Sequence, residues 1–542
     1  MTPSHTSPSE PAPVGGSTGE DAEDYGHDLP EQMQVRRDKR DRLVDSGAAY
    51  PVKPTVTHSL AQVRSAHSDL EAGEMSGREV SVAGRVMFLR NTGKLCFANL
   101  MAGDGTRLQV MLSLNRVGAA ALEDWKGLVD IGDHVAVTGE VGTSRRGELS
   151  VFADTWTMAS KSLRPLPVAH KPLAEETRVR RRYLDLIMRP EAQQMARERI
   201  AVVAGLRHSL GEREYLEVET PMLQTMHGGA AARPFVTHMN AFDLDLYLRI
   251  APELFLKRAV VGGLDRVFEI NRNFRNEGAD STHSPEFSML EFYEAYADYH
   301  DMARTTREII QEAALTVHDS LQVTHFDGTT HDLSGQWSEV SLFEATSDVL
   351  GESITPATDP GRLARLCSDV GIEPQSAWVP GKYAEELFEH HVVPTFDGPT
   401  FVFDYPTDMS PLVRAHRSKD AVVEKWDLYV DGYELATGYS ELVDPVIQRQ
   451  RLMEQTALRA AGDAEAMQVD EEFLRAMEHG MPPSGGVGLG IDRLLMTLTG
   501  RGIRDTILFP LVKPSLASGE ARDSRGSEAR TGHDDEDSNR DG

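Results

Sequence analysis

Residues 266–299 read RVFEINRNFRNEGADSTHSPEFSMLEFYEAYADY and combine the alternation of strands with an unusual set of polar side chains. Arg275 and Glu277 lie two residues apart in an extended run, so both side chains project from one strand face. A Gly-containing loop follows and leads into a second run with the same period of two. The loop and this run contribute His283, Phe287, Glu291 and Tyr293.

These side chains suit a charged ligand with a flat ring. The guanidinium fork of Arg275 matches a phosphate or a carboxylate with two parallel hydrogen bonds. The ring of Phe287 offers a surface on which a base can stack. For Arg275 alone, an ion pair with a glutamate that bridges two strands is the simpler alternative, but it does not explain the whole string.

A second informative stretch is HGMPPSGGVGLGIDRLLMTLTG (479–500). Gly486, Gly488 and Gly490 alternate along a predicted strand, which removes side chains and lets a ligand approach the backbone. Arg493 follows at the start of a predicted helix. The pattern is not a dinucleotide-binding fingerprint, because the acidic residue expected about 20 positions later in a βαβ unit is missing.

The region from Glu79 to about Lys161 has the period of short strands. Its five alternating runs, separated by turn signals such as NTG, AGDG and SRRG, are VSVAGRVMFLR, KLCFANLM, TRLQVML, HVAVTGEVG and ELSVFADTW. A helical stretch lies between the third and fourth runs. This order predicts an OB-fold barrel, a common platform for single-stranded nucleic acid, with another small barrel as the alternative.

Composition excludes several classes of protein. No apolar run reaches the roughly 18–20 residues of a membrane helix, so we expect no membrane partner. Cys96 and Cys367 are the only cysteines of the 542 residues, which excludes a disulfide framework and favours a reducing compartment. The net charge of −29 argues against binding to nucleic acid by charge alone.

Longer strings together resemble the three motifs of class II aminoacyl-tRNA synthetases, specifically the bacterial-type lysyl-tRNA synthetases. Motif 1 resembles YLEVETPML (215–223) with Pro221, motif 2 resembles FRNEG and HSPEFS (274–288), and motif 3 resembles GLGIDR (488–493). Further matching strings are GGAAARPF (228–235), YLRIAPELFLKR (247–258), GYSELVDP (438–445) and IRDTILFP (503–510). The resemblance covers roughly 31–514.

The resemblance implies an α+β protein, with an anticodon-binding OB-fold barrel before a catalytic domain of antiparallel sheet flanked by helices. It also implies a cytoplasmic homodimer that joins L-lysine to tRNA(Lys) with ATP and Mg²⁺. The predicted divisions are a disordered acidic tail (1–30), a helical segment (31–77), the OB-fold domain (78–165), a linker (166–190), the catalytic domain (191–514) and a second disordered acidic tail (515–542).

The resemblance also assigns roles to single residues. Arg275, Glu277 and Arg493 would be catalytic and, with His283 and Phe287, would bind ATP. The residues implied for lysine binding are Gly229, Glu253, Glu291, Tyr293, Thr437, Tyr439 and Glu441. Asp427 and Glu434 would hold Mg²⁺, whereas without the family they would be taken for surface charges of a strand. The residues implied for anticodon binding are Arg90, Phe97, Gln109 and Glu148; the simpler alternative for Phe97 is a core aromatic.

The sequence departs from the family pattern at three positions. Asp427 stands where the family has Glu, which shortens one predicted magnesium ligand by a methylene group. Thr437 and Val443 stand where the family has Asn, and the first of these lies near the predicted activation site. These departures point to an auxiliary copy of the enzyme as one possibility.

Three alternatives share parts of this pattern. An aspartyl or asparaginyl enzyme also has the barrel, but Glu253, Glu291 and Glu441 would repel an acidic substrate. An enzyme that transfers lysine to another acceptor, such as a protein, would be expected to lack the barrel. A non-catalytic RNA-binding or regulatory paralogue would be expected to have lost Arg275, Glu277 or Arg493.

Overall fold

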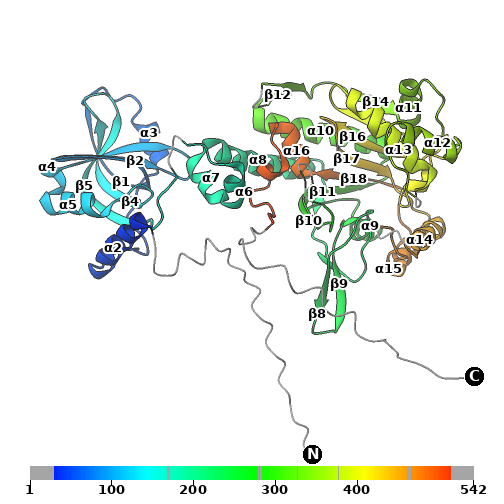
Figure 1. Cartoon of the computed structure of the whole chain (residues 1–542), viewed down its shortest axis with the longest axis horizontal. Coiled ribbons are helices and arrows are strands. Elements are labelled where there is room, and N and C mark those ends of the chain that lie inside the picture. The colour runs from blue at the N-terminus through cyan, green and yellow to red at the C-terminus, as the bar shows by residue number, and fades with distance from the viewer. Residues whose placement is uncertain are drawn as a thin grey trace, which may run out of the picture. The chain divides into compact units, whose positions relative to one another are not determined.

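The computed structural model describes residues 30–167, 171–278, 280, 283–325, 328–375, 378–460 and 465–513 (Figure 1). The chain divides into two compact units, and the division falls between Leu173 and Ala174. The tails predicted at 1–30 and 515–542 lie outside the described residues, apart from Pro30. Within the described part of the chain, no helix has the length and apolar character needed to cross a membrane.

The first unit is a closed five-stranded barrel with the strand order β1-β2-β3-β5-β4. Its strands are β1 (Met75–Thr92), β2 (Leu95–Met101), β3 (Arg107–Ser113), β4 (His134–Thr143) and β5 (Leu149–Ser160). Its helices are α2 (Glu31–Asp45), α3 (Leu60–Ala66), α4 (Leu114–Val117) and α5 (Ala119–Leu128). The last two lie between the third and fourth strands, as predicted for an OB fold.

The alternation of side chains explains how the barrel closes on its core. Along β2, Cys96 and Ala98 are buried in the interior, whereas Phe97 between them points outward and is only partly buried. Trp125 of α5 is fully buried against the same core. Phe97 is therefore not a core aromatic, and the simpler alternative for this residue is wrong.

The second unit is built on an eight-stranded sheet with the order β14-β15-β16-β17-β18-β11-β10-β6. Its strands are β6 (Leu216–Glu217), β10 (Arg266–Phe274), β11 (Glu286–Ala295), β14 (Ser338–Ser341), β15 (Thr400–Phe403), β16 (Lys425–Val430), β17 (Tyr433–Ser440) and β18 (Ser484–Gly490). Pairing is antiparallel except at the two edges, β14–β15 and β6–β10. The antiparallel sheet with flanking helices confirms the predicted α+β class.

The helices of this unit flank the sheet, and small strand pairs lie beside it. The helices are α6 (Glu175–Arg180), α7 (Arg182–Met188), α8 (Pro190–Glu212), α9 (Glu253–Val261), α10 (Tyr299–His318), α11 (Leu342–Leu350), α12 (Pro360–Asp369), α13 (Pro380–His391), α14 (Pro445–Ala460), α15 (Glu471–Glu478), α16 (Ile491–Thr499) and α17 (Ile503–Thr506), and two 3₁₀ turns span Val393–Thr395 and Thr407–Met409. The remaining strands are β7 (Leu223–Gln224), β8 (Val236–Met239), β9 (Leu244–Leu248), β12 (Gln322–Thr324) and β13 (Thr330–Asp332). Helices α6 and α7 occupy part of the stretch predicted as a linker, and α7 packs on α8.

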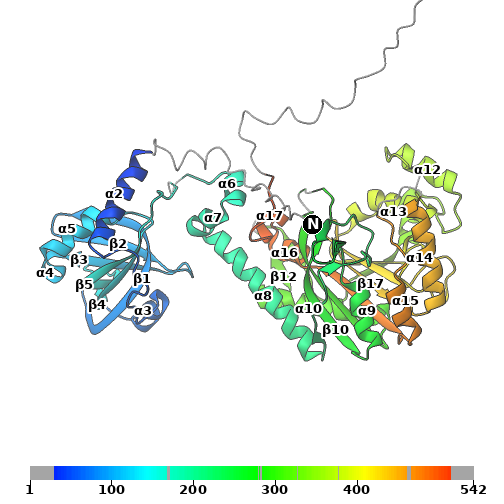
Figure 2. The same cartoon turned by 90° about the horizontal axis from the view of Figure 1, so that it is seen from below.

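The two faces of the large sheet have different coverings. Helices α8, α10 and α16 bury one face, and their apolar residues form the main core together with Trp426 and Leu428 of β16 (Figure 2). The neighbouring residue Tyr429 faces the other side and packs with α11, α12 and α13. These three helices pack over the strands at one edge, and the functional side chains described below lie on the remainder of this second face.

Candidate active site

Strand register brings the predicted site residues into two rows across the sheet. Glu291 of β11 lies opposite Gly488 of β18, which lies opposite Thr437 of β17, and Asp427 of β16 completes the row. In the next row the order is Tyr293, Gly486, Tyr439 and Lys425. Residues in register share a face of the sheet, so segments far apart in sequence meet here.

Strand β18 crosses both rows and contributes a glycine to each, Gly488 to the first and Gly486 to the second. A Cβ atom added at Gly486 would collide with Oε1 of Glu441 and with the ring of Tyr293. At Gly488 it would meet the methyl carbon of Met289 at 2.5 Å. The alternating glycines therefore leave room that side chains of neighbouring strands occupy, and the approach of a ligand to this backbone stays a prediction.

Next to strand β18 lies a cavity of about 310 Å³ that brings together all five residues predicted to bind ATP. Its lining includes Arg275, Glu277, His283, Phe287, Glu434, Thr437 and Arg493. The Arg275 guanidinium lies over the Phe287 ring at 5.1 Å, and Arg493 Nη2 lies 3.1 Å from Nε2 of His283. Among the described residues, the buried Nε of Arg275 has no hydrogen-bond partner. Two guanidinium groups and an aromatic ring in one cavity suit the phosphates and the base of a nucleotide.

A buried carboxylate fixes the helix that carries Arg493. Asp492 Oδ1 lies 2.5 Å from Nη1 of Arg199 in α8, and its Oδ2 accepts the backbone N–H of Ser288 in β11 at 2.7 Å. Three elements therefore meet at this side chain, next to both Phe287 and Arg493. Asp492 was not predicted as a site residue, although it belongs to the quoted GLGIDR string.

The residues predicted to bind lysine form an acidic group next to this cavity. Glu253, Glu291, Tyr293 and Glu441 each expose 5% or less of their surface. The Tyr293 hydroxyl donates to Glu291 Oε2 at 3.3 Å. Burial, together with the charge of Glu253, raises the pKa of Glu291 well above its ordinary value. Buried acids of like charge need cations, so the group suits a cationic ligand.

An internal cation already lies among these acids. Nζ of Lys257 is 2.6 Å from Oε1 of Glu253 and 2.6 Å from Oε2 of Glu441. The side chain of Lys257 is fully buried. It was missed at the sequence level, although the spacing of four between Glu253 and Lys257 on one helix was a visible signal for that pair.

Gly229 reaches the acidic group through its backbone conformation. Its φ of +88° is a region that favours glycine. A Cβ atom at this position would lie 2.9 Å from Cβ of Glu253. Glycine is therefore required both by the turn and by the close approach to α9.

Asp427 and Glu434 fit the carboxylate pair expected for Mg²⁺. Within the described part of the chain, the buried Oδ1 of Asp427 has no hydrogen-bond partner. Its Oδ2 lies 2.8 Å from Nζ of Lys425. Burial, followed by the charge of Asp427, raises the pKa of Glu434. Nearby carboxylate oxygens with an unpartnered lone pair match the preferences of a hard divalent cation.

A second group of metal-ligating residue types lies elsewhere in this unit. It consists of His325, His331 and Asp431, whose ligand atoms lie within 4.8 Å of one another. His325 Nε2 is 2.7 Å from the carbonyl oxygen of Thr497, and His331 Nδ1 is 2.8 Å from Oδ1 of Asp431. Each of these three side chains therefore has a polar partner within the chain.

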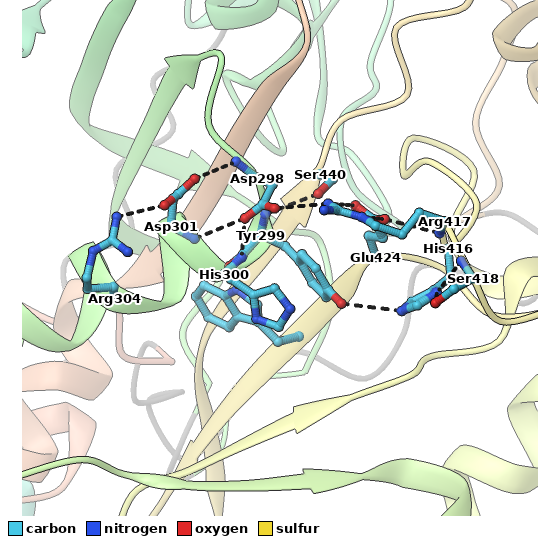
Figure 3. A network of polar contacts seen from close by, with 11 residues as sticks. Asp298, Tyr299, His300, Asp301, Arg304, His416, Arg417, Ser418, Glu424 and Ser440 are labelled. Atoms are coloured by element: carbon cyan, nitrogen blue, oxygen red, sulfur yellow. Dashed lines mark hydrogen bonds and ion pairs between the residues drawn. The ribbon is translucent and has the colours of Figure 1, made fainter.

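A polar network supports the strand end that precedes Glu441 (Figure 3). The backbone N–H of Tyr299, at the start of α10, donates to Oγ of Ser440 at 3.1 Å. Arg417 reaches Oδ2 of Asp298 at 3.0 Å and Oε2 of Glu424 at 2.8 Å. Burial alone would raise the pKa of Glu424, but hydrogen bonds from Arg417 and Ser440 lower it to about 2.

In the barrel, the residues predicted to bind the anticodon lie toward the outer side. Arg90 of β1 is opposite Phe97 of β2, and Gln109 of β3 is opposite Asn99, two residues along from Phe97. Gln109 Oε1 accepts a hydrogen bond from Ser150 Oγ at 3.0 Å. The Glu148 side chain just before β5 is 53% exposed and lies 3.9 Å from Nη1 of Arg64.

Comparison with known protein families covers both units. The family model described as tRNA synthetases class II (D, K and N) matches residues 174–513. A second model, described as an OB-fold nucleic acid binding domain, matches residues 80–159. The second match confirms the OB fold rather than another small barrel.

Individual relatives narrow the family further. A lysine–tRNA ligase of Kineococcus radiotolerans is 61% identical over 489 residues, which are 90% of this chain and 98% of that protein. A lysine–tRNA ligase of Mycolicibacterium gilvum is 59% identical over 493 residues, with the same two coverages of 90% and 98%. The lysylphosphatidylglycerol biosynthesis bifunctional protein LysX of Nocardia farcinica is 48% identical over 497 residues, 91% of this chain but 43% of that protein.

These matches confirm the resemblance on which the motif assignments rested. They do not favour an aspartyl or asparaginyl enzyme, nor a non-catalytic paralogue. The chain belongs to the class II tRNA synthetases, and within them to the lysine–tRNA ligases.

Proposed function

We propose that the protein activates L-lysine with ATP and then transfers the lysyl group to the 3′-terminal ribose of tRNA(Lys). The proposal is supported above all by the sheet register, which sets the buried acid Glu291, and the end of β17 that precedes Glu441, beside the cavity that holds Arg275 and Arg493. One side of the site thus suits an ammonium group and the other suits phosphates.

In the first step, a carboxylate oxygen of lysine attacks the α-phosphorus of ATP. The bond from that phosphorus to the bridging oxygen breaks, and pyrophosphate leaves. No general base is needed because the carboxylate is already a nucleophile. Arg275 stabilises charge between the carboxylate and the α-phosphate, Glu277 and His283 hold the nucleotide, and the adenine lies between Phe287 and Arg493.

Lysine is selected by the buried acidic group. Glu441 and Tyr293 bind its side-chain ammonium, with Glu291 adjoining, and Tyr439 packs along the aliphatic stem. Gly229 and Glu253 bind the α-amino group, while Thr437 adjoins the carboxylate. An uncharged analogue would leave buried acids unpaired, so it is rejected.

Asp427 and Glu434 are the proposed ligands of Mg²⁺. Bound there, the ion would neutralise charge on the phosphates. The chain's own contribution is to hold both carboxylates on adjacent strands, with Lys425 offsetting part of their charge. Asp at position 427 supplies the same oxygen chemistry as the family's Glu on a shorter side chain.

The second step engages the barrel and, we propose, a second copy of the chain. Arg90, Phe97, Gln109 and Glu148 would contact the anticodon of tRNA(Lys). A homodimer through motif 1 is supported by apolar side chains exposed there, because Leu216, Met222 and Leu223 are each about half exposed. A cytoplasmic location is supported by the two free cysteines.

The test is lysine-dependent pyrophosphate exchange, run with each amino acid in turn, followed by charging of total tRNA. We expect exchange with lysine alone and charging of tRNA(Lys). Exchange without charging would point to another acceptor for the lysyl group. Folded protein without exchange would contradict the proposal and would direct attention to Thr437 and Asp427.

A further inference from the structure

The buried ammonium of Lys257 has no assigned role in the proposed reaction, yet it contacts two of the acids proposed to bind lysine. Nζ lies 2.6 Å from a carboxylate oxygen of Glu253 and 2.6 Å from one of Glu441. One acid is on the same helix, α9, and the other follows β17. Lys257 therefore ties helix α9 to the end of β17 within the acidic group.

The charges of this group do not balance. Three buried acids, Glu253, Glu291 and Glu441, face a single ammonium, that of Lys257, in a place shielded from water. Among the described residues, Oε1 of Glu441 has no hydrogen-bond partner. The ammonium groups of a ligand would offset this excess of negative charge.

We propose that Lys257 is a positioning residue that sets the charge of the amino-acid pocket to accept one side-chain cation. Its ammonium offsets part of the negative charge and holds Glu253 and Glu441 in place, and the remaining negative charge is left for the substrate. The inference rests on the proposed lysine pocket and goes beyond it, because Lys257 acts through Glu253 and Glu441 and does not touch the substrate.

The ionisation of the neighbouring groups agrees with this role. Burial alone would lower the pKa of Lys257, but the two carboxylates raise it, so the ammonium is permanent at neutral pH. Burial raises the pKa of Glu441 to about 7, with Glu253 adding and Lys257 opposing. Glu291 and Tyr293 face the group from β11, and Tyr439 faces it from β17.

Removing the ammonium of Lys257 should therefore make the binding of substrate lysine release a proton from the protein. Without Lys257, the pKa of Glu441 rises further, and the pocket holds a proton at pH 8 that wild type does not. The ammonium of an incoming lysine must displace this proton. Lysine affinity then weakens at pH 8 and recovers as the pH is raised.

The chain offers a matched control in its barrel. Lys161 is also fully buried and also bridges two acids, with Nζ 2.7 Å from Asp133 and 2.5 Å from Asp130. Lys161→Met removes the same kind of buried ammonium at a site outside the amino-acid pocket. It reports what the loss of a buried ion pair does to the protein in general.

The experiment compares full-length wild type, Lys257→Met and Lys161→Met at pH 8. The number of protons exchanged on lysine binding is measured by titration calorimetry in buffers of different ionisation enthalpy. We expect Lys257→Met to release about one more proton per lysine than the other two proteins. Its KM for lysine in pyrophosphate exchange should rise about tenfold or more, while its KM for ATP stays within about twofold.

Equal proton numbers in all three proteins would overturn the inference, as would a parallel rise in both KM values at every pH. If Lys257→Met does not fold, Lys257→Gln keeps a hydrogen-bond donor without the charge and is used instead. Absence of lysine-dependent exchange in wild type would contradict the proposed function itself, so the two failures are distinguishable.

Discussion

At the scale of single residues, the pocket proposed for lysine depends on Gly486, a position without a side chain. The space beside Gly486 is filled by the Glu441 carboxylate and the Tyr293 ring, so even a methyl group there would displace both. The neighbouring elements cannot relax independently, because β18 is paired on both sides.

Gly486→Ala should therefore lower the free energy of unfolding by about 1–3 kcal/mol and raise KM for lysine about tenfold, because overpacking moves Glu441. Denaturation in urea and lysine-dependent exchange measure the two effects. Gly211→Ala in α8 is the control, since nothing lies within 4 Å of the added carbon. Equal behaviour of the two variants would show that the pocket adapts to the methyl group.

The ionisation of a single residue, Glu424, makes the stability of the fold depend on pH. Its carboxyl is fully buried, and the folded-state pKa of about 2 lies below the ordinary value of 4.5. A depressed pKa stabilises the fold above pH 4.5, and this contribution is lost as the pH falls toward 2. Because Arg417 is 53% exposed, solvent screening reduces the gain.

We expect Glu424→Gln to lower the free energy of unfolding by about 2 kcal/mol at pH 7 and by progressively less below pH 4.5. Urea denaturation of both proteins between pH 3 and pH 7 follows the difference. A difference that does not change with pH would mean that packing, and not ionisation, is what the substitution removes.

At the scale of elements, α16 is oriented by one carboxylate that joins a helix, a strand and a second helix. Asp492 binds Arg199 of α8 and the backbone of β11, and the next residue is Arg493 of the nucleotide cavity. Removing one partner leaves the other charge buried and unpaired, which is the costly case for ion pairs.

Asp492→Asn should lower the free energy of unfolding by about 3 kcal/mol and raise KM for ATP more than KM for lysine. Urea denaturation and exchange kinetics measure these changes. Glu472→Gln removes an exposed partner of Arg475 and should change stability by less than about 0.5 kcal/mol. A loss in the control as large as in Asp492→Asn would refute the assigned role.

Some helices and strands could be predicted from the sequence, and others could not. Strands β2, β11 and β18 could be predicted because side chains alternate between the two faces of a strand, and this alternation is visible in the local sequence. The helices α6 and α7 could not, because a stretch with prolines and clustered arginines resembles a linker; in the structure Arg182 pairs with Asp185 and with the carbonyl oxygen of Leu508. The ion pair between Lys257 and Glu441 likewise could not be predicted, because the two residues are far apart in sequence and share no local pattern.

At the scale of the whole molecule, the two units have separate proposed tasks. The residues proposed for amino-acid activation lie in the second unit, after Ala174, and those proposed for anticodon recognition lie in the barrel. The two partial reactions therefore report on the two units separately.

Phe97→Ala should reduce kcat/KM for tRNA charging about 10-fold or more, because a stacked base contributes about 1–3 kcal/mol. Lysine-dependent pyrophosphate exchange, which needs no tRNA, should not change. Both reactions are measured on the same preparation. A comparable fall in exchange would mean that the substitution damages the fold and not the contact.

Each unit also contains one buried cysteine, Cys96 in the barrel and Cys367 in the second unit. Burial raises the pKa of both thiols, that of Cys367 to about 11, so neither forms much thiolate at neutral pH. Reaction with a chromogenic disulfide then requires a unit to open. The labelling rate of Cys96 therefore measures how often the barrel opens, and that of Cys367 how often the second unit opens. No engineered probe is needed.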